Sequence, residues 1–143
     1  MPLDARSEKH LAQINLELAV KVRKILETMR SFGYPMVITD GNRTLEEQKK
    51  IYAVGRFGNP GPIVTNMDGV IKKSNHQDGR AVDCAFLDKN GSAYYPNSVT
   101  LWNAYGVLGE LSGLIWGGRW KSPVDKPHLE LPKPATVPGT IDV

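Results

Sequence analysis

The chain has 143 residues, of which 41% are hydrophobic and 23% are charged, and its 18 basic and 15 acidic side chains give a net charge of +3. These proportions are those of a globular protein, so they exclude a disordered or collagen-like chain, and the length suits a single domain with its own core. The apolar stretches are far shorter than the ~20 residues that cross a bilayer, and the mild positive charge does not require a nucleic-acid partner.

The first predicted element is an amphipathic helix that begins near Leu11 and ends before Gly33, where Pro35 prevents continuation. Its apolar residues recur at steps of three and four, which places them on one face of a helix. We interpret this face as core packing. The residues on it are Leu11, Ile14, Leu18, Val22, Ile25 and Met29.

A strand and a second helix follow. Residues 36–39 are rich in β-branched side chains and are followed by Asp40-Gly41, which predicts a short strand. Thr44 and Glu47 have the spacing of a capping box, which predicts a helix from Thr44 to about Ala53. Residues 56–73 are rich in Gly, Pro, Asn and Asp and predict a long surface loop, a kind of segment that is often functional.

The second half of the chain predicts a strand over 80–87, a helix that ends at Gly113, and short strands at 115–116 and 128–131. The proline-containing residues 132–143 predict a poorly ordered tail after a single domain over residues 1–131. This order of elements predicts an α+β fold, in which helices pack on one side of a small antiparallel sheet.

The cysteine content and the first residues of the chain bear on its compartment. A single cysteine, Cys84, excludes an intramolecular disulfide and is compatible with a reducing cytosol. The first six residues contain no apolar segment of the kind that a secretory signal requires. We therefore expect a protein made in the cytoplasm without a signal peptide.

Two of the three histidines stand in unusual surroundings. His76 lies in a predicted loop, seven residues before Asp83, which lies in a predicted strand. His128 follows a turn that Pro123 and Pro127 stiffen. A carboxylate placed among apolar strand residues, as Asp83 is, is costly unless a cation or strong hydrogen bonds compensate it. Two imidazoles and one carboxylate are a ligand set that holds a catalytic zinc ion and leaves a fourth position open. The candidate metal ligands are therefore His76, Asp83 and His128.

The residue spacing alone leaves other roles open. Asp125 and Glu130 are both candidates for the base that takes a proton from water, and Glu130 could instead be a hydrogen-bond partner of His128. Isolated histidines are more often structural than metal-binding. Trp116 and Trp120 are candidates either for the wall of a cleft or for the core. Cys84 points away from Asp83 in a strand and is expected to be a small buried hydrophobe.

Three motifs together resemble one family. Ser-x-His-x-x-Gly-x-Ala-x-Asp at 74–83, Trp-Gly-Gly-x-Trp at 116–120 and Asp-x-Pro-His-x-Glu at 125–130 resemble the zinc peptidases that cleave peptidoglycan stem peptides. These are the D-Ala-D-Ala carboxypeptidases and, more closely, the L-alanyl-D-glutamate endopeptidases used as phage endolysins. The resemblance covers about residues 9–131 and includes the segment at 39–44.

The resemblance implies a function for each candidate. It implies that Zn²⁺ lies in a cleft on the sheet, held by the three candidate ligands, and that Asp125 is the base. It implies that Arg43 holds the substrate or the oxyanion, as suits a permanent cation, and that Ser74 is a supporting polar residue beside the site. Asn42 departs from the family, which usually has an aromatic residue there, so substrate contacts at this position are expected to differ.

The implied activity is hydrolysis of an amide bond of the stem peptide by metal-activated water, with L-Ala-D-Glu as the expected bond. The alternatives are a D-Ala-D-Ala carboxypeptidase of the same fold, a non-catalytic cell-wall-binding module, and a cysteine hydrolase that uses Cys84. We expect a bacteriolytic monomer that binds peptidoglycan, binds no nucleic acid, and does not insert into a membrane. It would reach the wall after holin-type release or lysis.

Overall fold

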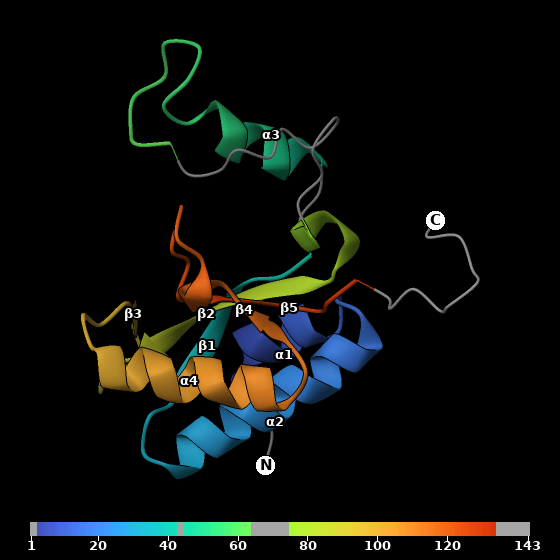
Figure 1. Cartoon of the computed structure of the whole chain (residues 1–143), viewed down its shortest axis with the longest axis vertical. Coiled ribbons are helices and arrows are strands. Elements are labelled where there is room, and N and C mark those ends of the chain that lie inside the picture. The colour runs from blue at the N-terminus through green and yellow to red at the C-terminus, as the bar shows by residue number, and fades with distance from the viewer. Residues whose placement is uncertain (1–2, 43–44, 64–74, 134–143) are drawn as a thin grey trace.

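The computed structural model describes residues 3–42, 45–63 and 75–133, which form an α+β domain (Figure 1). Within these residues, no helix is both long and apolar enough to span a membrane. The helical elements are α1 (Ala5–Leu11), α2 (Leu16–Ser31), α3 (Leu45–Ala53), η1 (Asn75–Asp78), α4 (Val99–Leu111) and η2 (Gly117–Arg119). The strands are β1 (Met36–Asp40), β2 (Ala81–Leu87), β3 (Ala93–Tyr94), β4 (Ile115–Trp116) and β5 (His128–Glu130).

The sheet is antiparallel throughout and is organised around β2. Its strand order is β1-β2-β5-β4, and β3 also pairs with β2. The register of β2 against β5 places Asp83 directly opposite His128. On the other side of β2, the register with β1 shifts between Ile38 and Asp40, so that Asp40 becomes the partner of Asp83. This shift in the register of β1 therefore lies directly beside Asp83 of β2.

Helices α1, α2 and α4 form a layer on one face of the sheet, whereas α3 lies on the other side (Figure 1). The core lies between the sheet and this layer, because most of the residues that line both surfaces are apolar and buried. The prediction of an α+β fold with helices on one side of an antiparallel sheet is confirmed for these three helices. The largest fully buried side chains include Leu18, Ile25, Met29, Ile38, Phe86, Tyr105 and Leu129.

The prediction of one helix running from Leu11 was wrong, because the chain forms two helices there. The Asp4 side chain caps α1 by accepting a hydrogen bond from the amide of Ser7, and the Asn15 side chain caps α2 by accepting from two amides of its first turn. Leu11 ends α1, and Ile14 lies in the connection. Both still pack against the same core, which is why the apolar spacing appears continuous in the sequence.

The other predicted elements agree with the structure except at their ends. The predicted helix to Ala53 is α3, but the proposed cap at Thr44 lies outside the described residues, as do residues 64–73 of the predicted loop and 134–143 of the predicted tail. The two-residue strand β3 was not predicted, and neither were the 3-10 helices η1 and η2. Strand β3 follows a turn in which the Asp88 side chain accepts hydrogen bonds from the amides of Asn90 and Ser92.

Gly106 is required where α4 packs against β4. A Cβ atom built at Gly106 would lie 2.1 Å from the ring of Trp116, which cannot yield because the indole is itself buried. We therefore expect Gly106→Ala to lower the free energy of unfolding by about 2 kcal/mol, since overpacking outweighs the better helix propensity of alanine. Chemical denaturation measures this. Asn103→Ala, on the exposed face of α4, is the control, and equal stabilities of the two variants would contradict the packing argument.

Candidate metal centre

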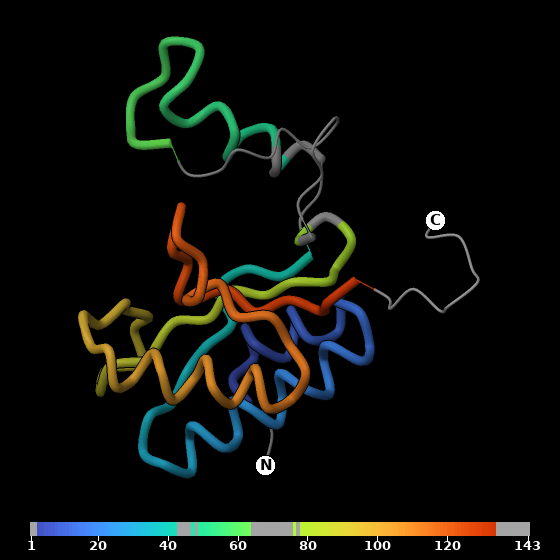
Figure 2. Tube along the Cα trace, viewed as in Figure 1, coloured from blue at the N-terminus to red at the C-terminus, as the bar shows by residue number. Residues whose placement is uncertain are grey.

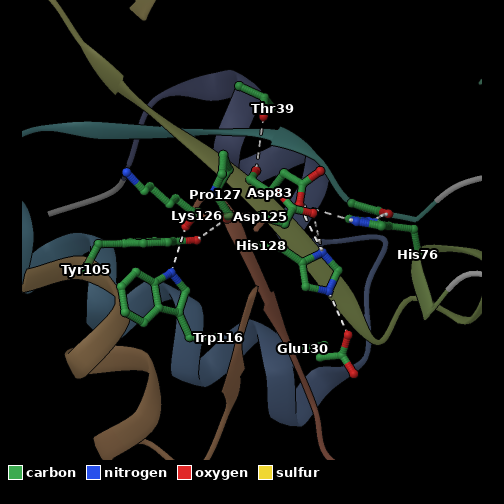
Figure 3. Close-up of polar contacts among 11 residues, drawn as sticks. Thr39, His76, Asp83, Tyr105, Trp116, Asp125, Lys126, Pro127, His128 and Glu130 are labelled. Atoms are coloured by element: carbon green, nitrogen blue, oxygen red, sulfur yellow. Dashed lines mark hydrogen bonds and ion pairs between the residues drawn. The ribbon is translucent and has the colours of Figure 1, made fainter. Parts of the chain in front are cut away.

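The structure brings together the three side chains that the sequence singles out as metal ligands. His76 is on η1, Asp83 is on β2 and His128 is on β5 (Figure 3). One ligand atom from each residue can be chosen so that all three lie within 4.8 Å of one another. The β2–β5 register explains half of this arrangement, because it sets Asp83 beside His128. Contacts of η1 with β2 explain the other half.

The spacing of Asp83 from the two histidine nitrogens fits zinc. Asp83 Oδ1 lies 3.4 Å from His76 Nε2 and 3.2 Å from His128 Nδ1. Zinc binds nitrogen and oxygen ligands at about 2.0–2.2 Å in a tetrahedron, which places two ligand atoms about 3.3 Å apart. Two imidazoles and one carboxylate occupy three positions and leave a fourth open, as in catalytic zinc sites. The cluster is therefore a zinc-type site.

Each histidine has a hydrogen-bond acceptor on the ring edge that faces away from Asp83. His76 Nδ1 donates to the carbonyl of Gly41 at 3.0 Å, and His128 Nε2 donates to Glu130 Oε1 at 2.7 Å. In the neutral form of each ring, which is the form that binds a metal, these bonds leave His76 Nε2 and His128 Nδ1 as the lone-pair nitrogens, and both face the carboxylate of Asp83. Such outer partners orient ligating imidazoles and select the tautomer that binds the metal.

The charges of the site also favour a bound cation. Burial raises the pKa of Asp83, but hydrogen bonds from His128 and His76 outweigh this effect and hold that pKa well below its usual range. Burial lowers the pKa of His128, but its hydrogen bonds to Asp83 and Glu130 prevail and raise the pKa to about 9. Without a metal, a proton on His128 therefore balances the carboxylates. A divalent cation can replace that proton, because metal binding and deprotonation of the ligand are coupled.

Asp125 and Glu130, between which the spacing could not choose, lie at opposite edges of the His128 ring. Asp125 Oδ2 is 3.8 Å from Nδ1, on the edge that faces Asp83, whereas Glu130 is bonded to Nε2 (Figure 3). The Asp125 side chain is 38% exposed and is not in the cluster of ligand atoms. Asp125 therefore lies at the same ring edge of His128 as the candidate ligand Asp83, and Glu130 lies at the opposite edge.

The two tryptophans of the predicted motif have different surroundings. Trp116 is 3% exposed and belongs to the core, so it does not form a wall of the site. Trp120 is half-buried and packs against His128, with ring centroids 4.9 Å apart. Gly117 between them lies so close to the following loop that a Cβ atom there would be 2.4 Å from the Asp125 carbonyl oxygen. The glycine therefore allows the loop to bring Asp125 to the site.

Cys84 is fully buried in the core, as the sequence predicts. Burial raises the pKa of its thiol to about 12. Because the thiolate is the nucleophilic form, a cysteine in this environment is inert near neutral pH. The cysteine-hydrolase alternative therefore finds no support in the structure.

Some residues of the site cannot be compared with their predictions. Arg43 and Ser74 lie outside the described residues, and Asn42, at the edge of that part, is exposed. The sequence reasoning missed the Gly41 carbonyl as the partner of His76. A backbone carbonyl is present at every position, so the sequence contains no signal that would have identified this one.

Glu130 provides a direct test of the outer hydrogen bonds. Removing its carboxylate with Glu130→Ala frees His128 Nε2 from its partner, so we expect zinc affinity to fall by about 10- to 100-fold. Competition with a chromophoric chelator measures the affinity. Glu110→Ala is the matched control. It also removes a paired carboxylate, but the partner of Glu110 is Arg119 on the surface and not a candidate metal ligand. Unchanged affinity in Glu130→Ala would show that the bond does not hold the ring.

Comparison with known proteins agrees with this geometry. The D-alanyl-D-alanine carboxypeptidase family matches residues 69–131. The peptidoglycan L-alanyl-D-glutamate endopeptidase CwlK of Bacillus subtilis (strain 168) is 36% identical over 106 residues, which are 69% of this chain and 62% of that protein. The chain thus spans less than two thirds of the length of this curated relative.

Solved structures share the fold at lower identity. The L-Ala D-Glu endopeptidase ChiX of Serratia marcescens superposes with a TM-score of 0.63 at 24% identity, over 90% of this chain and 87% of that chain. The vancomycin resistance D,D-pentapeptidase VanY, in complex with Zn(II), gives a TM-score of 0.56 at 18% identity, over 82% of this chain and 72% of that chain. These likenesses show that the α+β arrangement around the His-Asp-His cluster is a known fold.

Proposed function

We propose that the chain is a zinc-dependent hydrolase of peptidoglycan stem peptides, on the premise of its match to the D-alanyl-D-alanine carboxypeptidase family over residues 69–131 and its 36% identity to CwlK. The observation that carries the proposal is the arrangement around His128. The ring contacts Asp83 and approaches Asp125 through one nitrogen, and binds Glu130 through the other. A metal site with an open position and a carboxylate beside it is the arrangement that amide hydrolysis requires.

The bond we propose is L-Ala-D-Glu. CwlK, the relative that is 36% identical, is named as an endopeptidase for this bond, and so is ChiX. The second candidate is the D-Ala-D-Ala bond, which the description of the matching family favours. A wall-binding module without turnover is less well supported, because the three candidate ligands are clustered and Asp125 lies 3.8 Å from His128, as hydrolysis would require.

In the proposed mechanism, His76, Asp83 and His128 would hold zinc, and Asp125 moves the proton. When bound, zinc supplies a Lewis acid that lowers the pKa of water and polarises the scissile carbonyl. Asp125 accepts a proton from the attacking water and returns it to the leaving amine, so one carboxylate acts first as base and then as acid. The half-exposed side chain of Asp125 is accessible to both water and substrate.

We propose that Arg43 and Ser74 complete the substrate site. Arg43 follows Gly41 by two residues, and Gly41 supplies the carbonyl that binds His76. Ser74 precedes His76 by two residues. A permanent cation close in the chain to a metal ligand is suited to the developing oxyanion or a substrate carboxylate. A phage endolysin role, with holin-type release or lysis before the protein reaches the wall, remains a prediction from the sequence resemblance.

Mass spectrometry of digested peptidoglycan tests the function and the bond together. Purified wall is incubated with the zinc-loaded protein and with the same protein treated with a chelator. Peptides that begin with D-Glu are expected for the proposed bond, and release of free D-Ala alone would indicate the carboxypeptidase. Saturable binding without new amine ends would support the wall-binding module, and cleavage that survives complete metal removal would overturn the zinc mechanism.

A further inference from the structure

The short segment 125–128 contains both the proposed base and a candidate metal ligand. The chain leaves β4, passes through η2, and returns along this segment into β5 (Figure 2). At its two ends the segment is held by backbone hydrogen bonds, from the amide of Asp125 to Gly117 and from the amide of His128 to Asp125. The positions of the Asp125 carboxylate and the His128 ring therefore depend on how firmly the two residues between them are held.

Two buried aromatic side chains hold those residues. Trp116 Nε1 donates to the carbonyl of Lys126 at 2.8 Å, and the Tyr105 hydroxyl donates to the carbonyl of Pro127 at 2.7 Å (Figure 3). Trp116 is 3% exposed and Tyr105 is fully buried. The Pro127 carbonyl also accepts a hydrogen bond from the amide of Cys84 on β2. Both carbonyls between the base and the ligand are thus bound to the core.

The Trp116 ring is itself confined. Gly106 of α4 and Gly118 of η2 lie against it so closely that a Cβ atom at either position would be within 2.3 Å of ring atoms. The Arg119 guanidinium lies over the ring, 5.1 Å from its centroid. Because the ring cannot shift without displacing α4 or η2, its N–H is a fixed point for the Lys126 carbonyl. A rigid donor of this kind transfers the rigidity of the core to the site.

We propose that Trp116 and Tyr105 are positioning residues that set the placement of Asp125 relative to His128. Neither residue belongs to the cluster of ligand atoms, and both bind the backbone carbonyls of Lys126 and Pro127. The 3.8 Å separation of Asp125 Oδ2 from His128 Nδ1 is the geometry that they maintain. The consequence for catalysis rests on the proposed function, whereas the ordering of the segment does not.

Trp102 provides a matched control for Trp116. Both indoles are 3% exposed, and each donates at 2.8 Å to a backbone carbonyl, that of Pro96 for Trp102 and that of Lys126 for Trp116. Trp116→Phe and Trp102→Phe therefore make the same chemical change in one core, because each replaces a buried indole with a smaller ring and removes one N–H bond to a backbone carbonyl. Only the first change releases a carbonyl of segment 125–128.

The experiment compares zinc affinity, kcat and KM, and amide hydrogen exchange in the two variants. For Trp116→Phe we expect zinc affinity and kcat each to fall about tenfold with KM nearly unchanged, the size expected when an outer partner of a metal site is lost. Amide exchange at Asp125 and His128 should accelerate in this variant. For Trp102→Phe, we expect a similar fall in stability, but zinc affinity, kcat and these exchange rates should remain within twofold of the unaltered protein.

Tyr105→Phe keeps the ring and removes only the hydroxyl, so it tests the proposal even if Trp116→Phe fails to fold. It is expected to accelerate exchange at His128 and to lower kcat more than KM. Equal effects of Trp116→Phe and Trp102→Phe, together with unchanged exchange in Tyr105→Phe, would overturn the positioning role. The proposed function would survive that result, because it is tested separately by zinc binding and zinc-dependent wall cleavage of the unaltered protein.

Discussion

The variants His76→Ala and His128→Ala are each expected to lose zinc during desalting and to lose at least about a thousandfold in the rate of peptidoglycan cleavage. Each removes one of three ligands, and the remaining histidine and Asp83 then bind the ion too weakly to retain it. The expected rate loss corresponds to about 4 kcal/mol of transition-state stabilisation that the metal supplies. Metal content by elemental analysis and release of new amine ends measure the two effects.

His10→Ala is the control for these changes. His10 is the third histidine of the chain and is not in the ligand cluster. The His10→Ala variant should retain one zinc ion per chain and most of the activity. Stoichiometric zinc in both His76→Ala and His128→Ala would show that the metal binds elsewhere, and the proposed centre would then be wrong.

The sequence predicted the elements with a strong local pattern. Helix α4 was recognisable from its apolar spacing, and β2 from an apolar run that ends at an Asn-Gly turn. The break between α1 and α2 was missed because it depends on the side-chain cap of Asn15, whereas the apolar spacing continues through it. Local patterns thus locate elements more reliably than they locate the ends of those elements.

The site was predictable to a different extent. The ligand types and the unfavourable position of Asp83 in an apolar strand were sufficient to nominate the cluster. The strand register that sets Asp83 opposite His128 is a tertiary property, and no pattern within either strand specifies it. For the same reason, spacing alone could not separate Asp125 from Glu130. Both are near His128 in the chain, and only the orientation of the ring shows which nitrogen each one approaches.

Asp125→Ala and Asp125→Asn are expected to keep zinc at full occupancy but to lower kcat by about 100- to 10,000-fold, the usual contribution of a general acid–base group. The carboxylate is outside the ligand cluster, and the backbone amide of Asp125, which donates to Gly117, is unchanged by either substitution. The loop should therefore stay in place while proton transfer is lost. Zinc content, together with kcat and KM on a stem-peptide substrate, measures these effects.

Comparing the Asp125 variants with Glu130→Ala shows which of the two carboxylates is the base. If Asp125 is the base and Glu130 orients His128, the Asp125 variants lose turnover with zinc bound, whereas Glu130→Ala loses zinc affinity and recovers turnover at higher zinc concentrations. The reverse pattern would exchange the two roles. The reverse pattern is disfavoured physically, because Glu130 Oε1 is already bonded at 2.7 Å to the Nε2 edge, whereas Asp83 and the proposed metal position are at the Nδ1 edge of the ring.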